Sequence, residues 1–318
     1  MHEPHYRDAL RHGFTLARQH TYLWVFALFA ALVGHFGISS AVSSVYAGSI
    51  SGGKIPVVRL DAFLSFVTSF PHSIDASVLV IWLLLTLLGL GVGLTLVALV
   101  SQGAIVSASA QWFGRKKLPE AADAWHNGVE HMWRLLALVL IKGIVISLIA
   151  RIIASVSAAS SGTAFSNIIF FIAFLVTLGI GLIISFLHIY AVGFVVVEQY
   201  SLKDAIGSAW RMFVDHWLVS LEVAVLLTGV GLLFGLAVFI GFPLFMIPAI
   251  ILWFFSVQTG SVLLYSFGIL VGSLLFIAFI MFLGAIYTVF SLSTWTYMFM
   301  KMHRHGIVSR IVHYLKRG

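Results

Sequence analysis

Five ionisable residues within or beside long apolar runs are the first candidates for a functional site. They are Lys142, Arg151, His188, Glu198 and Glu222. A charged side chain inside a bilayer costs at least a few kcal/mol, so such residues usually mark a ligand site, an ion path or a buried pair. Lys142 and Glu222 lie at comparable depths in two predicted spans. We expect them to pair, either to fix helix packing or as part of a polar translocation path.

Three histidines, each closing an amphipathic segment, form a second set of candidates. They are His20, His131 and His216, and each has Tyr or Trp close behind it. Because these aromatic rings prefer the headgroup boundary, we expect the three imidazoles at the membrane surface. There they are either ordinary interfacial polar groups or equivalent sites that bind phosphate headgroups or sense pH.

The sequence contains no recognisable catalytic or metal-binding motif. It has no cysteine, which excludes thiolate nucleophiles and cysteine metal sites. The tail histidines His303, His305 and His313 match no standard zinc spacing, and no serine elbow or Gly-Lys-Ser/Thr loop occurs. We predict a protein without catalytic residues, metal or cofactor. The nominees for the alternative, a membrane-embedded lipid-modifying hydrolase, are Glu198, Asp215, His131 and His216.

Composition places the chain in a membrane. Hydrophobic residues make up 61% and charged residues only 9%, whereas a soluble domain has about a quarter charged residues. With about 20 apolar residues needed per crossing, we predict an all-α polytopic protein with six spans. Their ranges are 21–42, 76–98, 133–155, 168–190, 217–239 and 262–290. The stretch 243–257 contains two prolines and is predicted to re-enter or lie on the outer face.

The distribution of basic residues predicts the orientation in the membrane. Fourteen of the eighteen lysines and arginines fall in the N-terminal arm, two alternate connections and the C-terminal tail. Since basic residues favour the cytoplasmic side, both termini are predicted to be cytoplasmic. The net charge of +7 is then concentrated where it attracts anionic lipid headgroups, which makes lipids rather than nucleic acid the expected partner.

An amphipathic segment that ends in His and leads into an apolar run occurs three times. The copies cover 6–21, 118–132 and 201–217, and the first and third share an Asp-Ala pair twelve residues before His. This repetition predicts one membrane domain over 1–318, in which interfacial helices and helical hairpins form three repeats around a pseudo-threefold axis. The repeats are 1–112, 113–199 and 200–300, followed by a basic cytoplasmic tail over 301–318.

The start and the faces of these amphipathic helices follow from residue types. Ser201 with Asp204 is typical of a capping box at a helix start. In the first copy, apolar residues recur at helical spacing and alternate with arginines. The predicted apolar face is Tyr6, Leu10, Phe14 and Ala17, against Arg7, Arg11 and Arg18.

The third copy also carries a motif found in known membrane families. It consists of Val195-Val196-Val197-Glu198, Ser201, Asp204-Ala205, Ser208-Ala209-Trp210 and His216-Trp217-Leu218. This pattern resembles the membrane domain beside some glycerophosphodiester phosphodiesterases and the YciC-like inner-membrane proteins, which are bacterial and archaeal. The resemblance implies a prokaryotic cytoplasmic membrane protein. It does not imply phosphodiesterase activity, because no polar stretch here could form the soluble barrel of about 250 residues that such an enzyme needs.

These observations favour a non-enzymatic protein that binds or moves a lipid or small solute, or that organises the membrane. Transport predicts a polar cavity lined by Lys142, Glu198, Glu222 and His188. A scaffold for a partner membrane protein, or for further copies of the chain, predicts a closed bundle in which those groups are paired.

Overall fold

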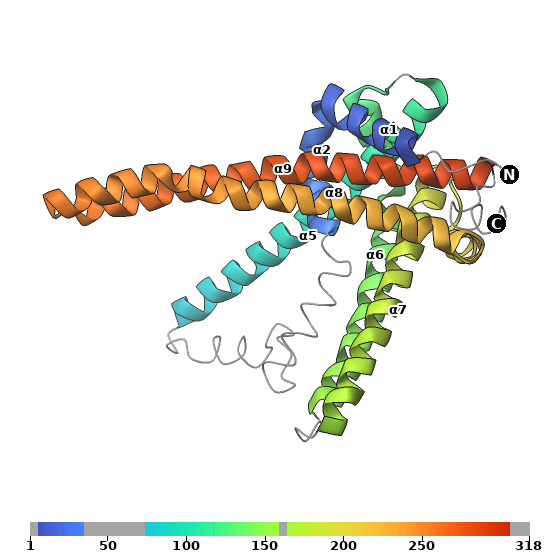
Figure 1. Ribbon diagram of the computed structural model, residues 1–318, viewed down its shortest axis with the longest axis horizontal. Coiled ribbons are helices and arrows are strands. Elements are labelled where there is room, and N and C mark those ends of the chain that lie inside the picture. The colour runs from blue at the N-terminus through green and yellow to red at the C-terminus, as the bar shows by residue number, and fades with distance from the viewer. Residues whose placement is uncertain (1–5, 35–73, 117, 159–163, 306–318) are drawn as a thin grey trace, which may run out of the picture. The chain divides into compact units, whose positions relative to one another are not determined.

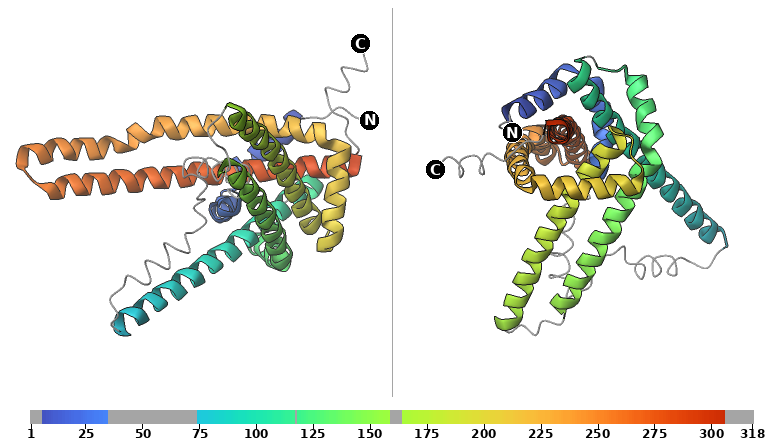
Figure 2. Two further views of the ribbon diagram at one scale, coloured as in Figure 1. Left: turned by 90° about the horizontal axis from the view of Figure 1, so that it is seen from below. Right: turned by 90° about the vertical axis from the view of Figure 1, so that its right-hand side faces the viewer.

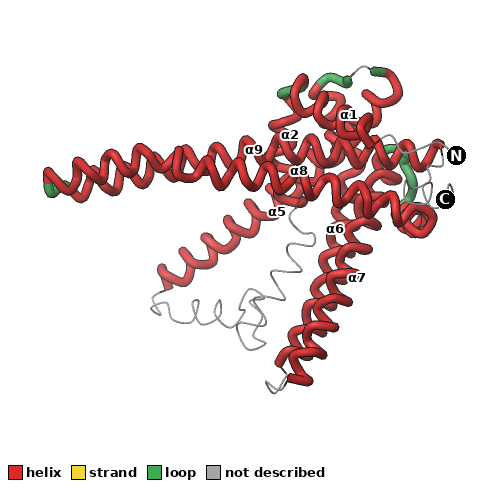
Figure 3. Tube along the Cα trace, in the orientation of Figure 1, coloured by secondary structure: helices red, strands yellow, loops and turns green. Residues whose placement is uncertain are grey.

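The computed structural model describes residues 6–34, 74–116, 118–158 and 164–305, and these form an all-helical protein (Figure 1). The helices are α1 (Tyr6–Gln19), α2 (Tyr22–Gly34), α5 (Ile74–Arg115), α6 (Ala121–Ala158), α7 (Ala164–Val196), α8 (Leu202–Thr259) and α9 (Val262–His305). Within the described ranges no β-strand occurs (Figure 3). The predicted fold class is thus confirmed at the level of secondary structure.

Five helices are long and apolar enough to cross a membrane: α5, α6, α7, α8 and α9. They carry large hydrophobic side chains on their exposed surfaces, such as Trp82 and Phe239. A multi-pass membrane protein explains this surface, because lipid is the solvent that apolar side chains favour. The first predicted span, 21–42, is described only to the end of α2, and the rest of it lies outside the described residues.

The chain divides into two compact units, which are described separately. Unit 1 contains Met1–Ala31, Ala104–His126 and Met212–Gly318, and unit 2 contains Leu32–Gly103 and Asn127–Arg211. Unit 1 therefore holds α1, most of α2 and α8, and α9, whereas unit 2 holds α7 and most of α5 and α6.

An antiparallel hairpin of α8 and α9 forms much of unit 1 (Figure 2). The chain reverses at Gly260, whose φ of +66° is accessible to glycine at little cost. Aromatic pairs join the two helices: the ring centroids of Phe242 and Phe276 are 5.2 Å apart, and those of Phe245 and Phe279 are 4.7 Å apart.

The prediction of a separate re-entrant segment at 243–257 is wrong. Pro243 and Pro248 lie inside α8, in which only His216 has non-helical backbone angles. A proline removes one backbone donor from a helix, and in a membrane neighbouring helices can compensate for that loss. The partner helix α9 packs along this stretch, through Phe276 and Phe279, and so supports its helical conformation.

Helix α1 packs against α9 through a face of small residues. Its buried residues are Ala9, Gly13, Leu16 and Ala17. A Cβ at Gly13 would clash with the carbonyl oxygen of Phe290, which lies only 2.7 Å from the ideal Cβ position. Of the predicted apolar face, Ala17 is buried, whereas Phe14 is 60% exposed and lies beside three exposed arginines, Arg7, Arg11 and Arg18.

The three amphipathic segments end in three different ways in the structure. A break at His20 and Thr21 separates α1 from α2, and a kink at His216 (φ −130°, ψ 24°) divides α8. The predicted boundary at His131 is wrong, because α6 runs through it from Ala121 to Ala158. His131 is only 2% exposed, and its Nδ1 lies 2.7 Å from the carbonyl oxygen of Asn127, so the imidazole packs along the helix without ending it.

In unit 2, α5 and α6 cross where two glycines face each other. An ideal Cβ at Gly103 would lie 3.2 Å from the Cα of Gly128, and a Cβ at Gly128 would clash with the carbonyl oxygen of Val100. Small residues allow membrane helices to approach this closely, which strengthens van der Waals packing.

We expect Gly128→Ala to destabilise the protein by about 1–3 kcal/mol, because the added methyl group must displace the backbone of α5. Gly143→Ala in the same helix is the matched control, since nothing lies within 4 Å of a Cβ at that position. The control should be neutral, or stabilising by up to about 1 kcal/mol through helix propensity. Thermal unfolding of both purified variants measures the difference, and an unchanged melting temperature for Gly128→Ala would contradict the described crossing.

Candidate functional site

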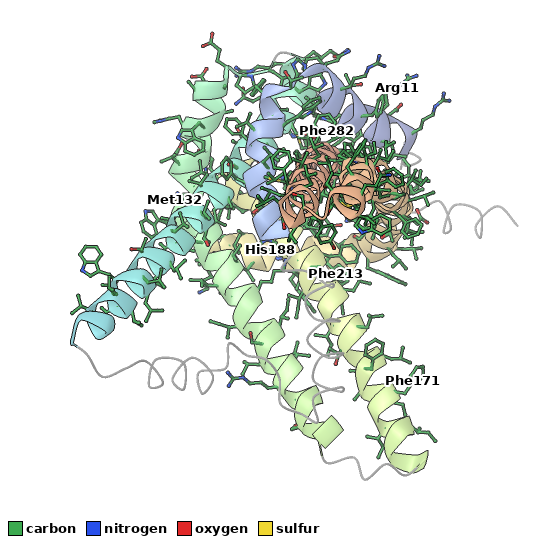
Figure 4. All side chains as sticks on the ribbon, turned by 90° about the vertical axis from the view of Figure 1, so that its left-hand side faces the viewer. Arg11, Met132, Phe171, His188, Phe213 and Phe282 are labelled. Atoms are coloured by element: carbon green, nitrogen blue, oxygen red, sulfur yellow. The ribbon has the colours of Figure 1, made fainter. Side chains whose placement is uncertain are left out.

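Lys142 and His188 are buried charged and polar side chains of unit 2. Each retains only 8% of its exposure, and the charge of Lys142 acts on the His188 imidazole. Lys142 follows Trp133 by nine residues, and His188 precedes the last residue of α7, Val196, by eight. At about 1.5 Å per residue, each lies roughly 12–14 Å along its helix from these positions. The two side chains therefore lie at similar distances along their helices from these positions. His188 is labelled in Figure 4.

Burial removes both side chains from most of their water contact. Among the described residues, the Nδ1 atom of His188 is buried without a hydrogen-bond partner. Buried polar atoms in proteins are normally hydrogen-bonded, to protein or to ordered water, so this nitrogen is free to bind water or a ligand.

Among the described residues of unit 2, three further buried side-chain atoms have no hydrogen-bond partner within the protein. They are Ser101 Oγ and Gln102 Oε1 on α5, and His131 Nε2 on α6. Along α6, His131 and Lys142 share one buried face with Leu135 and Leu138. We call Ser101, Gln102, His131, Lys142 and His188 the polar interior of unit 2. Each of these groups can bind a buried water or a polar ligand, and His131 lies roughly 16 Å from Lys142 along α6.

Glu222, unlike Lys142 and His188, lies outside unit 2 and has a hydrogen-bond donor on α1. It lies in unit 1 and accepts a hydrogen bond from the Tyr6 hydroxyl, which ties α1 to α8. Lys142 belongs to unit 2, so the pairing predicted for Lys142 and Glu222 stays a prediction. Of the other two candidates, Glu198 is half-buried just beyond the end of α7, and Arg151 is exposed on α6.

The motif that carries the family resemblance builds the turn between α7 and α8. Gln199 has a left-handed φ of 56°, and the Tyr200 N–H donates to the carbonyl of Phe194 at 3.1 Å. This bond and the left-handed residue before it cap the last turn of α7. Ser201 then begins α8, because the Asp204 N–H donates to its Oγ at 3.4 Å. The predicted helix start at Ser201 is thus present in the structure.

Arg134, which the sequence did not single out, supports the same turn. Its guanidinium donates to the carbonyls of Gln199 and Tyr200 at 3.5 and 3.4 Å. These carbonyls follow the end of α7, where helix C-terminal groups need external donors. The available signal was an arginine directly after the interfacial Trp133, next to the predicted membrane boundary.

The three histidines that were predicted at the membrane surface have different surroundings. His20 packs edge to face on Trp112 at 5.6 Å, and burial lowers the pKa of its imidazole. The Nδ1 of His216 lies 3.3 Å from the Met212 carbonyl oxygen. His20 and His216 belong to unit 1 and His131 to unit 2, so their equivalence around an axis stays a prediction.

Unit 1 contains a buried cluster around His12 that sequence reasoning missed. His12 Nε2 lies 3.2 Å from Ser109 Oγ, and its ring lies 5.0 Å from that of Tyr297. The Ser109 hydroxyl donates to the carbonyl of Ser293 at 3.3 Å, so its oxygen accepts from His12. Ser109 is also only 1% exposed. This arrangement joins α1, α5 and α9 and does not activate the serine as a nucleophile.

Neither a metal site nor a relative adds to this description. The described residues include no group of three or more His, Asp or Glu side chains that could hold a metal ion. Comparison of the chain with protein-family models, curated proteins and solved structures gives no match. Any function must therefore be argued from the chain's own chemistry.

Burial lowers the pKa of His12 from 6.5 to about 4. The folded state thus binds the proton less readily than the unfolded state, and stability should be greatest above pH 6.5 and fall as the pH approaches 4. We expect His12→Asn to reduce this loss of stability between pH 6.5 and 4. Thermal unfolding across that range measures it, with His126→Asn as the control because His126 is exposed. Equal pH profiles for the wild type and His12→Asn would contradict the prediction.

Proposed function

We propose that this protein binds and moves a lipid or small solute across the cytoplasmic membrane of a prokaryote, without converting it chemically. The observation that carries the proposal is the polar interior of unit 2, in which Lys142 and His188 are both buried and the His188 Nδ1 has no hydrogen-bond partner among the described residues. A pair that only fixed helix packing would be fully hydrogen-bonded, since breaking or leaving open a buried polar contact is costly. Polar groups that bind a ligand lack a hydrogen-bond partner within the protein until that ligand is bound.

The proposed topology has six spans, three repeats and cytoplasmic termini. Five long apolar helices support most of these crossings, and α2 would begin the remaining one. The breaks at His20 and His216 support a change from an interfacial to a spanning helix at the same point of two repeats. The proposed kinship with the YciC-like group rests on the sequence motif, which falls on the turn built by Gln199, Arg134 and Ser201.

Anionic lipid headgroups are the proposed partners at the cytoplasmic face. The exposed stripe of α1 joins three guanidinium groups to an aromatic ring: Arg7, Arg11, Phe14 and Arg18. Guanidinium groups bind phosphate well, and an exposed Phe can insert at the acyl boundary. The opposite face of α1 packs on α9, which holds the stripe outward.

The topology can be tested by cysteine labelling, because the chain has no cysteine of its own. His126→Cys, before the first span of the middle repeat, should react with an impermeant maleimide only in inside-out vesicles. Thr259→Cys, at the α8–α9 turn, should react only from the outer face. Both positions are exposed. Labelling of both from the same side would contradict the proposed orientation.

Ligand retention tests the function itself. We expect the full chain, released from native membranes in a mild detergent, to carry lipid or solute adducts in native mass spectrometry. Lys142→Met should lose most of that adduct, since it removes the buried ammonium group. Lys203→Met should retain it, because Lys203 is exposed at the start of α8. The scaffold role is favoured instead if the wild-type chain carries no adduct and if the wild type and Lys142→Met co-purify with the same partner proteins.

A further inference from the structure

The polar interior of unit 2 presents a positive charge and a hydrogen-bond donor together. Lys142 contributes an ammonium with three donors and no acceptor. His188 is buried to the same degree, at 8% exposure, and an imidazole ring N–H can donate one hydrogen bond. A partner for this pair must therefore supply negative charge to Lys142 and can accept a hydrogen bond from His188.

We infer that Lys142 and His188 form a subsite for a singly charged acidic group, a phosphodiester or a carboxylate, on the ligand that the protein binds. This inference rests on the proposed function and names the ligand class of the same site. Its chemistry follows from charge balance: one ammonium neutralises one negative charge, whereas a doubly charged phosphate monoester would leave an excess charge in a region where charge is costly.

The same balance discriminates between lipids. A phosphatidylglycerol headgroup brings one negative charge, which Lys142 neutralises. A phosphatidylcholine headgroup also brings a quaternary ammonium, which the positive charge of Lys142 repels. The subsite should therefore prefer the anionic lipid over the zwitterionic one, through a charge-assisted hydrogen bond.

The test compares these two lipids on the full chain in nanodiscs. Phosphatidylglycerol and phosphatidylcholine with the same acyl chains are each titrated, and bound lipid is counted by native mass spectrometry. The wild type should bind phosphatidylglycerol more tightly. Lys142→Met should reduce that preference about tenfold, as loss of one charge-assisted bond predicts. Lys142→Arg should restore most of it, and the matched control Lys203→Met should leave it unchanged.

The α1 arginines also attract anionic lipid, but all variants retain them, so the difference between the wild type and Lys142→Met isolates the subsite. If Lys142→Met fails to fold, the test rests on His188→Leu and on the binding of the two lipids by the wild type. His188→Leu should weaken phosphatidylglycerol binding several-fold. Added inorganic phosphate distinguishes the ligand source: displacement of the lipid supports a soluble monoanion, and no displacement supports a headgroup.

Two results separate failure of this inference from failure of the proposed function. Equal binding of the two lipids by the wild type, or an unchanged preference in Lys142→Met, would overturn the acidic subsite and leave ligand binding intact. No saturable binding of either lipid or of phosphate would overturn both.

Discussion

The absence of water in the hydrocarbon core is the constraint on which this structure depends. Every backbone N–H and C=O in a span must find its partner within the protein, and a continuous helix meets that requirement locally. This explains why α8 remains helical through Pro243 and Pro248. It also explains the concentration of specific contacts where helices end. The turn after α7 combines a left-handed Gln199, two carbonyls bound by Arg134 and the Ser201 cap.

Packing in this environment depends on shape more than on hydrophobicity. Lipid is as apolar as leucine, so burying a large aliphatic side chain between helices gains little over leaving it in the bilayer. Close backbone approach gains dispersion contacts instead, and small residues permit it. Gly128 on α6 and Gly13 on α1 both occupy such approaches, whereas Gly143 and Gly89 face open space. Glycine content alone therefore does not identify a helix crossing.

The same physics decides what the sequence could predict. Composition and the lengths of the apolar runs were sufficient for the helical class and for the five long spans, because these depend on local hydrogen bonding. The buried face of α1 was only partly predictable from hydrophobicity. The largest apolar residue, Phe14, is exposed, and the smallest residues, Ala9 and Gly13, are buried. Arg134 and His12 were missed because their partners, Gln199 and Ser109, are distant in sequence.

The contrast between two intramembrane polar sites bears most directly on function. Glu222 is half-buried and accepts a hydrogen bond from Tyr6 on α1. Lys142 and His188 are more deeply buried, and the protein leaves a histidine nitrogen without a partner. An apolar residue at either position would remove that cost without loss of helix packing. The cost is understandable if an external group completes the site, and the positive charge of Lys142 then defines the sign of the charge that this group must carry.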